Sequence, residues 1–286
     1  MSRVAYVNGT FVPQSRAAIS IQDRGFTFAD AVYEVFLVVG GRLIDAAWHW
    51  DRLERSLGEL DIAMPKPREA MELIARRMLA LNRVRDGSLY LQVSRGQEAR
   101  NHVYSQGLSP SVVMTAKAGK PKVDLSGGIS VRLEPDIRWR RPDIKTVGLL
   151  PNSMAKTRAL ADGFGDTWFV DDQGQVTEGT SANAWIVIDK DGKKWLQTRD
   201  ASRSILNGIT RMRVLELANA NGWQLVEKPF SVEEAKAADE AFLTSSTALI
   251  KPVGQIDDTQ IADGKVGPVT IAIGQLYRDF LAQVSV

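Results

Sequence analysis

The chain has 286 residues, of which 44% are hydrophobic and 24% charged, an ordinary globular composition with enough length for one large core or two smaller ones. Its 36 lysines and arginines against 34 aspartates and glutamates leave a formal net charge of +2. So small an excess predicts neither a nucleic-acid partner nor a membrane partner. The absence of cysteine excludes disulfides, thiolate metal ligands and a cysteine nucleophile.

The N-terminal sequence MSRVAYVNGTFVPQ contains no apolar signal-peptide core, and the longest apolar runs, such as VFLVV, are far too short to span a bilayer. We therefore expect a cytoplasmic protein. Only two histidines are present, His49 and His102, which argues against a multi-histidine metal site, and we predict no metal. Ser153 to Lys156 matches the SxxK motif, but its companion motifs are absent, so we interpret it as a chance match.

The first part of the chain predicts a sheet interrupted by two consecutive helices. Alternating apolar residues predict short strands, two glycines at 40–41 predict a hairpin turn, and longer periods predict helices. The expected strands cover 3–9, 15–21, 32–39, 42–45, 88–96 and 111–118, and the expected helices cover 48–60 and 65–82.

The stretch AGKPKVDLSGG, residues 118–128, is rich in glycine, lysine and proline and lacks periodicity, which is typical of a linker. Beyond it we expect strands, hairpins and helices, with a capping box in SVEE. The expected helices cover 152–161, 208–219 and the C-terminus, hairpins turn at 171–174 and 188–194, and strands cover 128–135, 239–246 and 249–256. We predict an α+β fold with mixed sheets and flanking helices, divided into domains 1–117 and 129–286.

Two segments have the composition of anion sites. In SILNGITR, Asn207 is a candidate N-cap, and Ile209 and Thr210 follow at the start of a helix, where free N–H groups and the helix dipole suit a phosphate. LTSST, residues 243–247, places a second hydroxyl cluster after a strand. For either segment alone, ordinary capping and turn chemistry is the favoured explanation.

Charged residues near strand ends suggest two further sites. Glu178 in VTEGTSAN leaves a strand and could hydrogen-bond a protonated ring nitrogen, although a solvated hairpin residue is the simpler interpretation. Arg95, Arg100 and His102 follow another strand. If that segment is extended, Arg100 and His102 face the same way and form a carboxylate clamp; the alternative is a solvated loop.

The segment RRPDIKTVGLLPNSMAK contains two lysines that could form a Schiff base, which requires an amine held near low-dielectric or cationic surroundings. Lys145 follows RRPDI, which supplies cations and a strand end. Lys156 lies in an amphipathic helix, where a lysine on a wet face is routine. The pattern favours Lys145.

Seven motifs together resemble one known family. Their order is that of the fold-type IV pyridoxal-phosphate aminotransferases, and within that family they are most similar to the D-amino acid branch. The motifs are DRGFTFADAVYEVF, HWDRLERS, RGQEARNH, DIRWRRPDIK, VTEGTSANAW, LNGITRMRV and LTSSTALIKPV.

The resemblance implies pyridoxal 5'-phosphate as cofactor and assigns a role to each matching position. Lys145 corresponds to the Schiff-base lysine and proton carrier, and Glu178 to the partner of the pyridine nitrogen. The remaining cofactor-binding positions are Arg52, Ile209, Thr210, Ser246 and Thr247 for the phosphate and Leu206 for the ring.

The resemblance also implies the substrates and the assembly. Tyr33, Arg100 and His102 occupy the carboxylate-trap positions of the D-amino acid branch, and in the family the arginine and histidine come from the partner subunit. A homodimer with its active site at the subunit interface follows. The implied reaction is ping-pong transamination between a D-amino acid, of the D-alanine or D-glutamate type, and pyruvate or 2-oxoglutarate.

The chain departs from the family pattern at Ala29 and Ala31, where glycines are usual, and at Glu98, an acidic residue near the clamp. Three related activities stay open: an L-branched-chain aminotransferase, an (R)-amine aminotransferase, and an aminodeoxychorismate lyase-like enzyme. Arg100 and His102 favour the D-amino acid branch because an amine substrate needs no carboxylate trap. A non-catalytic binding protein of the same fold is the alternative from another class, and Lys145 together with Glu178 argues against it.

Overall fold

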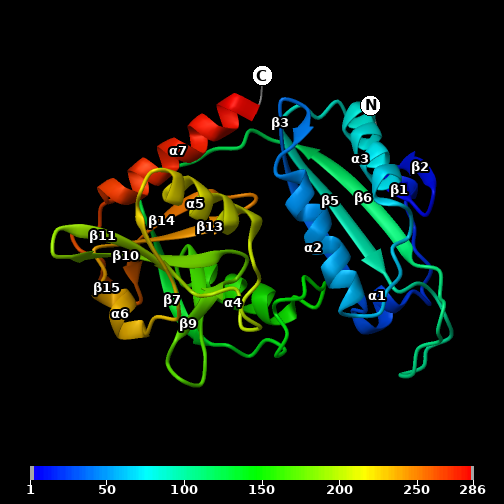
Figure 1. Ribbon diagram of the computed structural model, residues 1–286. Helices are drawn as coiled ribbons and strands as arrows, with labels where there is room; N and C mark the ends of the chain where they lie inside the picture. The colour runs from blue at the N-terminus through cyan, green and yellow to red at the C-terminus, as the bar shows by residue number, and fades with distance from the viewer. Residues whose placement is uncertain (1–2, 285–286) are drawn as a thin grey trace. The chain divides into compact units, whose positions relative to one another are not determined.

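The computed structural model describes residues 3–284 and divides into two compact units. Unit 1 contains the described residues up to Pro121, the segment Ile144–Gly148, and Val284; unit 2 contains Lys122–Asp143 and Leu149–Gln283. Both units combine helices with sheets (Figure 1), so the expected α+β class is confirmed. No helix within residues 3–284 is long and apolar enough to cross a membrane, and the cytoplasmic location stays a prediction.

Unit 1 is built on a six-stranded sheet of order β2-β1-β6-β5-β3-β4. Its helices α2 and α3 run along this sheet (Figure 1). The elements of unit 1 are β1 Val4–Val7, β2 Thr10–Pro13, η1 Gln14–Arg16, α1 Arg24–Phe28, β3 Ala31–Val39, β4 Arg42–Leu43, α2 Ala46–Gly58, α3 Arg68–Asn82, β5 Gly87–Ser94 and β6 Ser111–Ala118.

The two faces of this sheet have different roles. Because successive side chains of a strand point to opposite faces, Val32, Phe36 and Val38 of β3 pack against α2 and α3 in the core, whereas Tyr33 lies on the other face. Glu34 also belongs to the helix-covered face and is fully buried. The consecutive residues Tyr33 and Glu34 of β3 therefore place an aromatic ring on one face of the sheet and a buried carboxylate on the other.

One expectation about the N-terminal region needs correction. Residues 15–21 form no strand; a short 3-10 helix, η1, and irregular turns replace it, and the second strand is β2. Residues 15–21 are exposed, so the alternating small apolar residues do not pack against a hydrophobic core.

Ala29 ends α1 in the left-handed conformation, with φ 56°, which explains why glycine suits this position.

Unit 2 contains a mixed sheet of order β12-β11-β10-β13-β14-β7-β8-β9, with β15 added to β14. Its core includes Trp168, Ile186, Phe230 and Leu243. The elements of unit 2 are β7 Ile129–Pro135, α4 Leu150–Ala161, β8 Asp166–Val170, β9 Val176–Gly179, β10 Asn183–Lys190, β11 Lys193–Thr198, α5 Ile209–Ala220, β12 Gln224–Glu227, α6 Val232–Lys236, β13 Glu240–Ser245, β14 Leu249–Ile256, β15 Thr259–Gln260 and α7 Pro268–Val284.

Several local predictions match these elements. The strand expected over 249–256 coincides with β14, and Ser231 and Glu234 form the expected capping box of α6. The chain passes from unit 1 to unit 2 between Pro121 and Lys122, inside the predicted linker. The sequence prediction differs at residues 144–148, which it places in the second domain, whereas the structure groups them with unit 1.

Candidate active site

Lys145 lies on a short segment that extends the sheet of unit 1. The Tyr33 N–H donates to the Lys145 carbonyl (3.0 Å), the Val147 N–H donates to the Ala31 carbonyl (3.1 Å), and Val32 bridges to Thr146 in antiparallel fashion. This backbone pairing is the reason why the segment belongs to unit 1. It places the half-buried Lys145 with its Nζ 4.2 Å from the centroid of the Tyr33 ring.

Lys156 has a different environment. Its Nζ donates to the Gly165 carbonyl at 2.5 Å and lies 3.4 Å from Oδ1 of the buried Asp166. Both contacts connect α4 to the start of β8. Lys156 is therefore engaged in structural contacts, in agreement with the preference for Lys145 as the reactive amine.

Tyr33 belongs to a small aromatic group on the sheet face away from the helices. Its ring stacks on Tyr90, with centroids 5.7 Å apart, and the Tyr90 hydroxyl donates to Gln92 Oε1 at 2.8 Å. Burial, with a contribution from Tyr33, raises the pKa of Tyr90 to about 12. Tyr90 is therefore a neutral support for Tyr33, which in turn lies against Lys145.

Arg52 is held by a buried carboxylate. Its Nε donates to Glu34 Oε1 at 2.7 Å and its Nη2 to Glu34 Oε2 at 2.8 Å, while His49 Nδ1 lies 2.7 Å from the same Oε2. Burial alone raises the pKa of Glu34, but Arg52 and His49 lower it to about 2. Burial lowers the pKa of His49, so His49 is a neutral donor to the carboxylate. This bidentate pairing fixes the orientation of the Arg52 guanidinium.

Glu178, at the end of β9, is 6% exposed and is surrounded by donors. Arg138 Nη1 and Asn183 Nδ2 donate to its two oxygens, the latter at 3.0 Å, and the Leu206 N–H lies 3.3 Å from both oxygens. Arg138 is shared with a second acid, because its Nη2 donates to Asp136 Oδ2 at 2.6 Å. The cluster thus contains two carboxylates and one guanidinium.

The sharing of Arg138 has electrostatic consequences. Burial raises the pKa of Glu178, and Asp136 adds to the increase, although Arg138 and the Leu206 N–H act in the opposite direction. Burial also raises the pKa of Asp136, but Arg138 outweighs it and lowers that pKa. With both acids ionised, the cluster carries one excess negative charge. A cationic N–H group beside Glu178 would compensate this charge and favour the ionised carboxylate.

Asn183 connects Glu178 to the segment that precedes α5. Its Nδ2 also donates to the Leu206 carbonyl at 2.8 Å. A Cβ added to Gly208 would lie 2.1 Å from Asn183 Oδ1, so only glycine allows this close approach. The half-buried Leu206 is therefore positioned through its own N–H and carbonyl by the groups around Glu178.

The start of α5 differs from the prediction in one detail. The N-cap is Gly208, not Asn207, because Asn207 Oδ1 accepts a hydrogen bond from Arg211 Nη1 at 3.2 Å instead. Within residues 3–284, the N-cap of this 12-residue helix makes no side-chain capping hydrogen bond, whereas Ser231 caps α6. The first-turn N–H groups of Ile209 and Thr210 therefore retain the capacity to bind an anion.

Ser246 and Thr247 lie in the turn between β13 and β14. Ser246 is half-buried and Thr247 is exposed. Within residues 3–284, neither hydroxyl has a hydrogen-bond partner. They thus provide the hydroxyl cluster expected from the sequence, and its role in phosphate binding stays a prediction.

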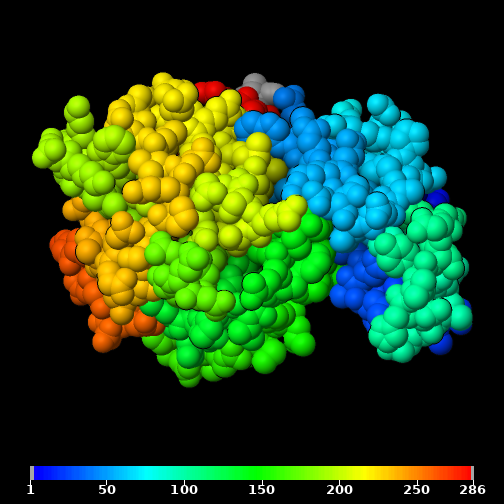
Figure 2. Space-filling model, turned by 60° about the horizontal axis from the view of Figure 1, so that its bottom comes forward, coloured from blue at the N-terminus to red at the C-terminus, as the bar shows by residue number. Residues whose placement is uncertain are grey.

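Arg100 and His102 lie on the surface of unit 1, in the segment between β5 and β6, shown in blue-green in Figure 2. They are in a loop, not in an extended strand. Both contact Phe28: the Arg100 guanidinium carbon lies 5.0 Å from its ring centroid and the His102 ring 5.4 Å. Among the described residues, neither side chain makes a hydrogen bond or an ion pair, so their donors remain available.

Comparison with known proteins identifies the family. Residues 31–256 match the family described as amino-transferase class IV, which is more than half of the chain. This chain belongs to the class IV aminotransferases. The class depends on pyridoxal phosphate, so the chain is a pyridoxal-phosphate-dependent enzyme, as the motifs implied.

Proteins similar to this chain are named as aminotransferases. The chain is 38% identical over 264 residues to a D-alanine aminotransferase of Bacillus licheniformis, with 92% of each chain covered. It is 36% identical over 284 residues to one of Listeria monocytogenes, covering 98% of this chain and 95% of that protein. The branched-chain amino acid aminotransferase of Escherichia coli superposes with a TM-score of 0.89 at 22% identity, covering 98% and 95% of the two chains. This last likeness concerns the fold alone.

Sequence reasoning missed several residues that position the candidate site residues within each unit. Glu34 interrupts an apolar strand on its helix-covered face, and that interruption was the available signal. Asn183 is conspicuous only as a polar residue beside the apolar run of β10. Arg138 lies among other arginines in DIRWRRPDIK, and nothing in that pattern distinguishes it. Several of their contacts join residues 15 to 40 positions apart, such as Arg138 and Glu178, and local patterns do not reveal these.

Proposed function

We propose that this class IV aminotransferase transfers the amino group of a D-amino acid, of the D-alanine or D-glutamate type, to pyruvate or 2-oxoglutarate. The observation that carries the proposal is the exposed loop with Arg100 and His102, whose donors make no hydrogen bond or ion pair among the described residues. The guanidinium of Arg100 and the imidazole of His102, two positions apart in this loop, are donors that suit a substrate carboxylate. The similarity to proteins named D-alanine aminotransferase supports the same substrate class.

The residues of each unit fit the chemistry of pyridoxal phosphate. In unit 2, the excess negative charge around Glu178 suits a protonated pyridine nitrogen, and the uncapped start of α5 at Ile209 and Thr210 suits a phosphate. In unit 1, Arg52 offers an oriented guanidinium for the phosphate, and Lys145 offers an amine. Leu206 would pack on the ring, and Ser246 and Thr247 would add hydroxyl donors to the phosphate.

Pyridoxal phosphate, when bound, would supply an electron sink for the Cα carbon of the amino donor. Lys145 would be the base that takes and carries the Cα proton. Glu178 keeps the ring nitrogen protonated, and Tyr33, Arg100 and His102 bind the carboxylate. Release of the first keto acid before the second binds gives ping-pong kinetics.

A half-reaction tests the substrate class. The purified holoenzyme is mixed separately with D-alanine, L-leucine and (R)-1-phenylethylamine, and loss of the visible cofactor band is followed. We expect rapid loss with D-alanine alone. A response mainly to L-leucine or to the amine would refute the D-amino acid proposal and favour the branched-chain or amine alternative.

Replacement of the two lysines tests the assignment of the base. Lys145→Ala should abolish turnover, because it removes the amine that carries the proton, whereas the matched control Lys156→Ala should retain it. The measurement is D-alanine transamination with saturating cofactor. Turnover at the wild-type rate in Lys145→Ala would overturn the assignment.

We also propose that the enzyme is a homodimer whose Arg100 and His102 complete the partner's site. Two inactive variants, Lys145→Ala and Arg100→Ala, should then complement each other when refolded together. Random pairing gives half heterodimers, each with one intact site of two, so about a quarter of wild-type activity is expected. If both residues serve the same chain, the mixture stays inactive.

A further inference from the structure

The loop that carries Arg100 and His102 is held by hydrogen bonds to residues beneath it. Residues 95–105 lead from β5 toward β6, and the side chains of Asn101, His102 and Val103 are exposed. If an exposed loop must become ordered when substrate binds, the loss of conformational entropy weakens binding. The contacts beneath this loop order it in advance and reduce that loss.

Arg24 is the central contact. This residue of α1 is only 4% exposed. Its Nη1 donates to the carbonyl of Asn101 at 2.7 Å and to Glu98 Oε1 at 3.0 Å, and its Nε donates to Asp30 Oδ2 at 2.9 Å. Asn101 is the residue between Arg100 and His102, so the guanidinium holds the clamp at its midpoint.

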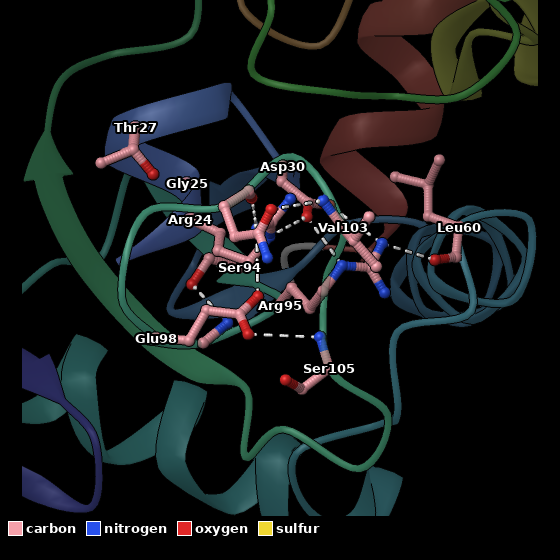
Figure 3. Close-up of polar contacts among 12 residues, drawn as sticks. Arg24, Gly25, Thr27, Asp30, Leu60, Ser94, Arg95, Glu98, Val103 and Ser105 are labelled. Atoms are coloured by element: carbon pink, nitrogen blue, oxygen red, sulfur yellow. Dashed lines mark hydrogen bonds and ion pairs between the residues drawn. The ribbon is translucent and has the colours of Figure 1, made fainter. Parts of the chain in front are cut away.

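Glu98 secures the loop on both sides of this midpoint. Its Oε1 accepts from Arg24, and its Oε2 accepts from the Ser105 N–H at 3.2 Å (Figure 3). Burial raises the pKa of Glu98, but Ser105 and Arg24 outweigh it and lower that pKa. Glu98 is therefore ionised and paired with Arg24, which accounts for an acidic residue so close to a carboxylate clamp.

The base of the loop is fixed by Arg95. Its guanidinium shares Asp30 with Arg24, with Nε to Oδ2 at 2.7 Å, and donates to the Leu60 carbonyl at 2.7 Å. The ring of Tyr104 lies 3.7 Å from the Arg95 guanidinium carbon. Both ends of the loop thus rest on one buried network.

A second route connects Arg24 to the clamp through Phe28. The Arg24 guanidinium carbon lies 4.5 Å from the Phe28 ring centroid, which is the same ring that Arg100 and His102 contact. The backbone of the clamp and its side chains therefore both depend on the position of Arg24.

We propose that Arg24, paired with Glu98, is a positioning residue that orders the Arg100–His102 loop and so determines the affinity for the substrate carboxylate. This inference rests on the proposed function of that loop. Arg24 would not touch the substrate. Its loss should weaken the binding of both carboxylate substrates and leave the cofactor site unchanged.

Steady-state kinetics of Arg24→Lys test the proposal. Lysine keeps the charge but lacks the planar fork that serves three acceptors. We expect KM for D-alanine and for the keto acid to rise about tenfold, the equivalent of about 1.4 kcal/mol, with kcat within about twofold and the Kd of pyridoxal phosphate unchanged. Arg68→Lys is the matched control, because Arg68 also binds a carboxylate, Asp51, and a backbone carbonyl, that of Ala47.

Glu98→Ala provides a second test if Arg24→Lys fails to fold. It removes the tie to Ser105 and the partner of Arg24, and it should raise KM in the same direction. In the double variant the effects should be clearly less than additive, because both residues act through one loop. Hydrogen exchange of the Val103 and Ser105 amides should accelerate in each variant and not in Arg68→Lys.

Unchanged KM in both variants would overturn the inference, and so would a parallel loss of kcat and cofactor affinity, which indicates general damage. These outcomes differ from failure of the proposed function. In that case the wild-type enzyme itself would not transaminate D-alanine, while the accelerated amide exchange in the variants would still be observed.

Discussion

Two buried glutamates, one in each unit, each pair with an arginine and yet differ in their electrostatic state. Glu34 accepts a bidentate pair of hydrogen bonds from Arg52, to which His49 adds a third donor. Glu178 shares Arg138 with Asp136. The pKa of Glu34 is lowered to about 2, whereas that of Glu178 is raised.

Burial and an arginine partner do not by themselves define a carboxylate's role. Around Glu34 the charges of acid and guanidinium balance, which is what a structural support for Arg52 requires. Around Glu178 one positive charge is missing, which is what a site for a cationic ligand requires.

The largest effect is expected for Glu34→Gln. The variant leaves the buried Arg52 without its carboxylate, and breaking a buried pair in this way costs about 3–5 kcal/mol of unfolding free energy. Urea unfolding at neutral pH measures this loss. The control is Glu134→Gln, whose pair with Arg158 is partly exposed, and it should cost less than about 1 kcal/mol. Equal costs for the two variants would mean that the Glu34 pair is not special.

The pH dependence of stability should distinguish the two glutamates by sign. Because the folded-state pKa of Glu34 lies at about 2 instead of 4.5, its contribution of about 3 kcal/mol is complete above pH ~4.5 and is lost as the pH falls through 2. The raised pKa of Glu178 has the opposite effect: its contribution is complete below pH ~4.5 and is lost as the pH rises through the folded-state pKa.

The measurement is the stability difference between the wild type and each glutamine variant from pH 2 upward. For Glu34→Gln the difference should grow with pH, and for Glu178→Gln it should shrink. Slopes of the same sign would show that the two environments are electrostatically alike, and the comparison would fail.

Asn183→Asp should sharpen the electrostatics of the Glu178 site. The substitution preserves shape, removes the donor to Glu178 and Leu206, and places a third carboxylate in the cluster. We expect a loss of about 2 kcal/mol at neutral pH that diminishes in acid. Asn82→Asp is the control, because Asn82 donates to the Val4 and Met78 carbonyls but has no acid among its hydrogen-bond partners. A loss independent of pH would attribute the effect to hydrogen bonds alone.

The smallest effect on stability is expected for Glu178→Gln. Asp136 remains with Arg138, so no charge is left buried without a partner, and the cost should be about 1 kcal/mol at neutral pH. Activity should nevertheless fall strongly, because a glutamine does not stabilise a protonated ring nitrogen. Denaturation and turnover measured on the same preparation test whether the variant loses activity while keeping most of its stability. A variant that is as unstable as Glu34→Gln, or as active as the wild type, would contradict the prediction.

The sequence by itself determined the features that depend on neighbouring residues. Strand alternation located β14, the Ser231–Glu234 pair located the start of α6, and LNGITR located the start of α5 within one residue. Caps, turns and periodicity act over a few residues, so they can be interpreted without knowledge of the fold. The order of the seven motifs similarly indicated the family before any geometry was known.

Only the tertiary structure decided which distant groups meet. The sequence gives no reason why Lys145 should pair with β3, why Glu34 should hold Arg52, or why Arg24 should reach the carbonyl of Asn101, 77 residues away. Strand pairing and core packing bring these residues together, and burial then fixes their charge states. For that reason the candidate reactive residues could be predicted from local motifs, whereas the residues that position them could not.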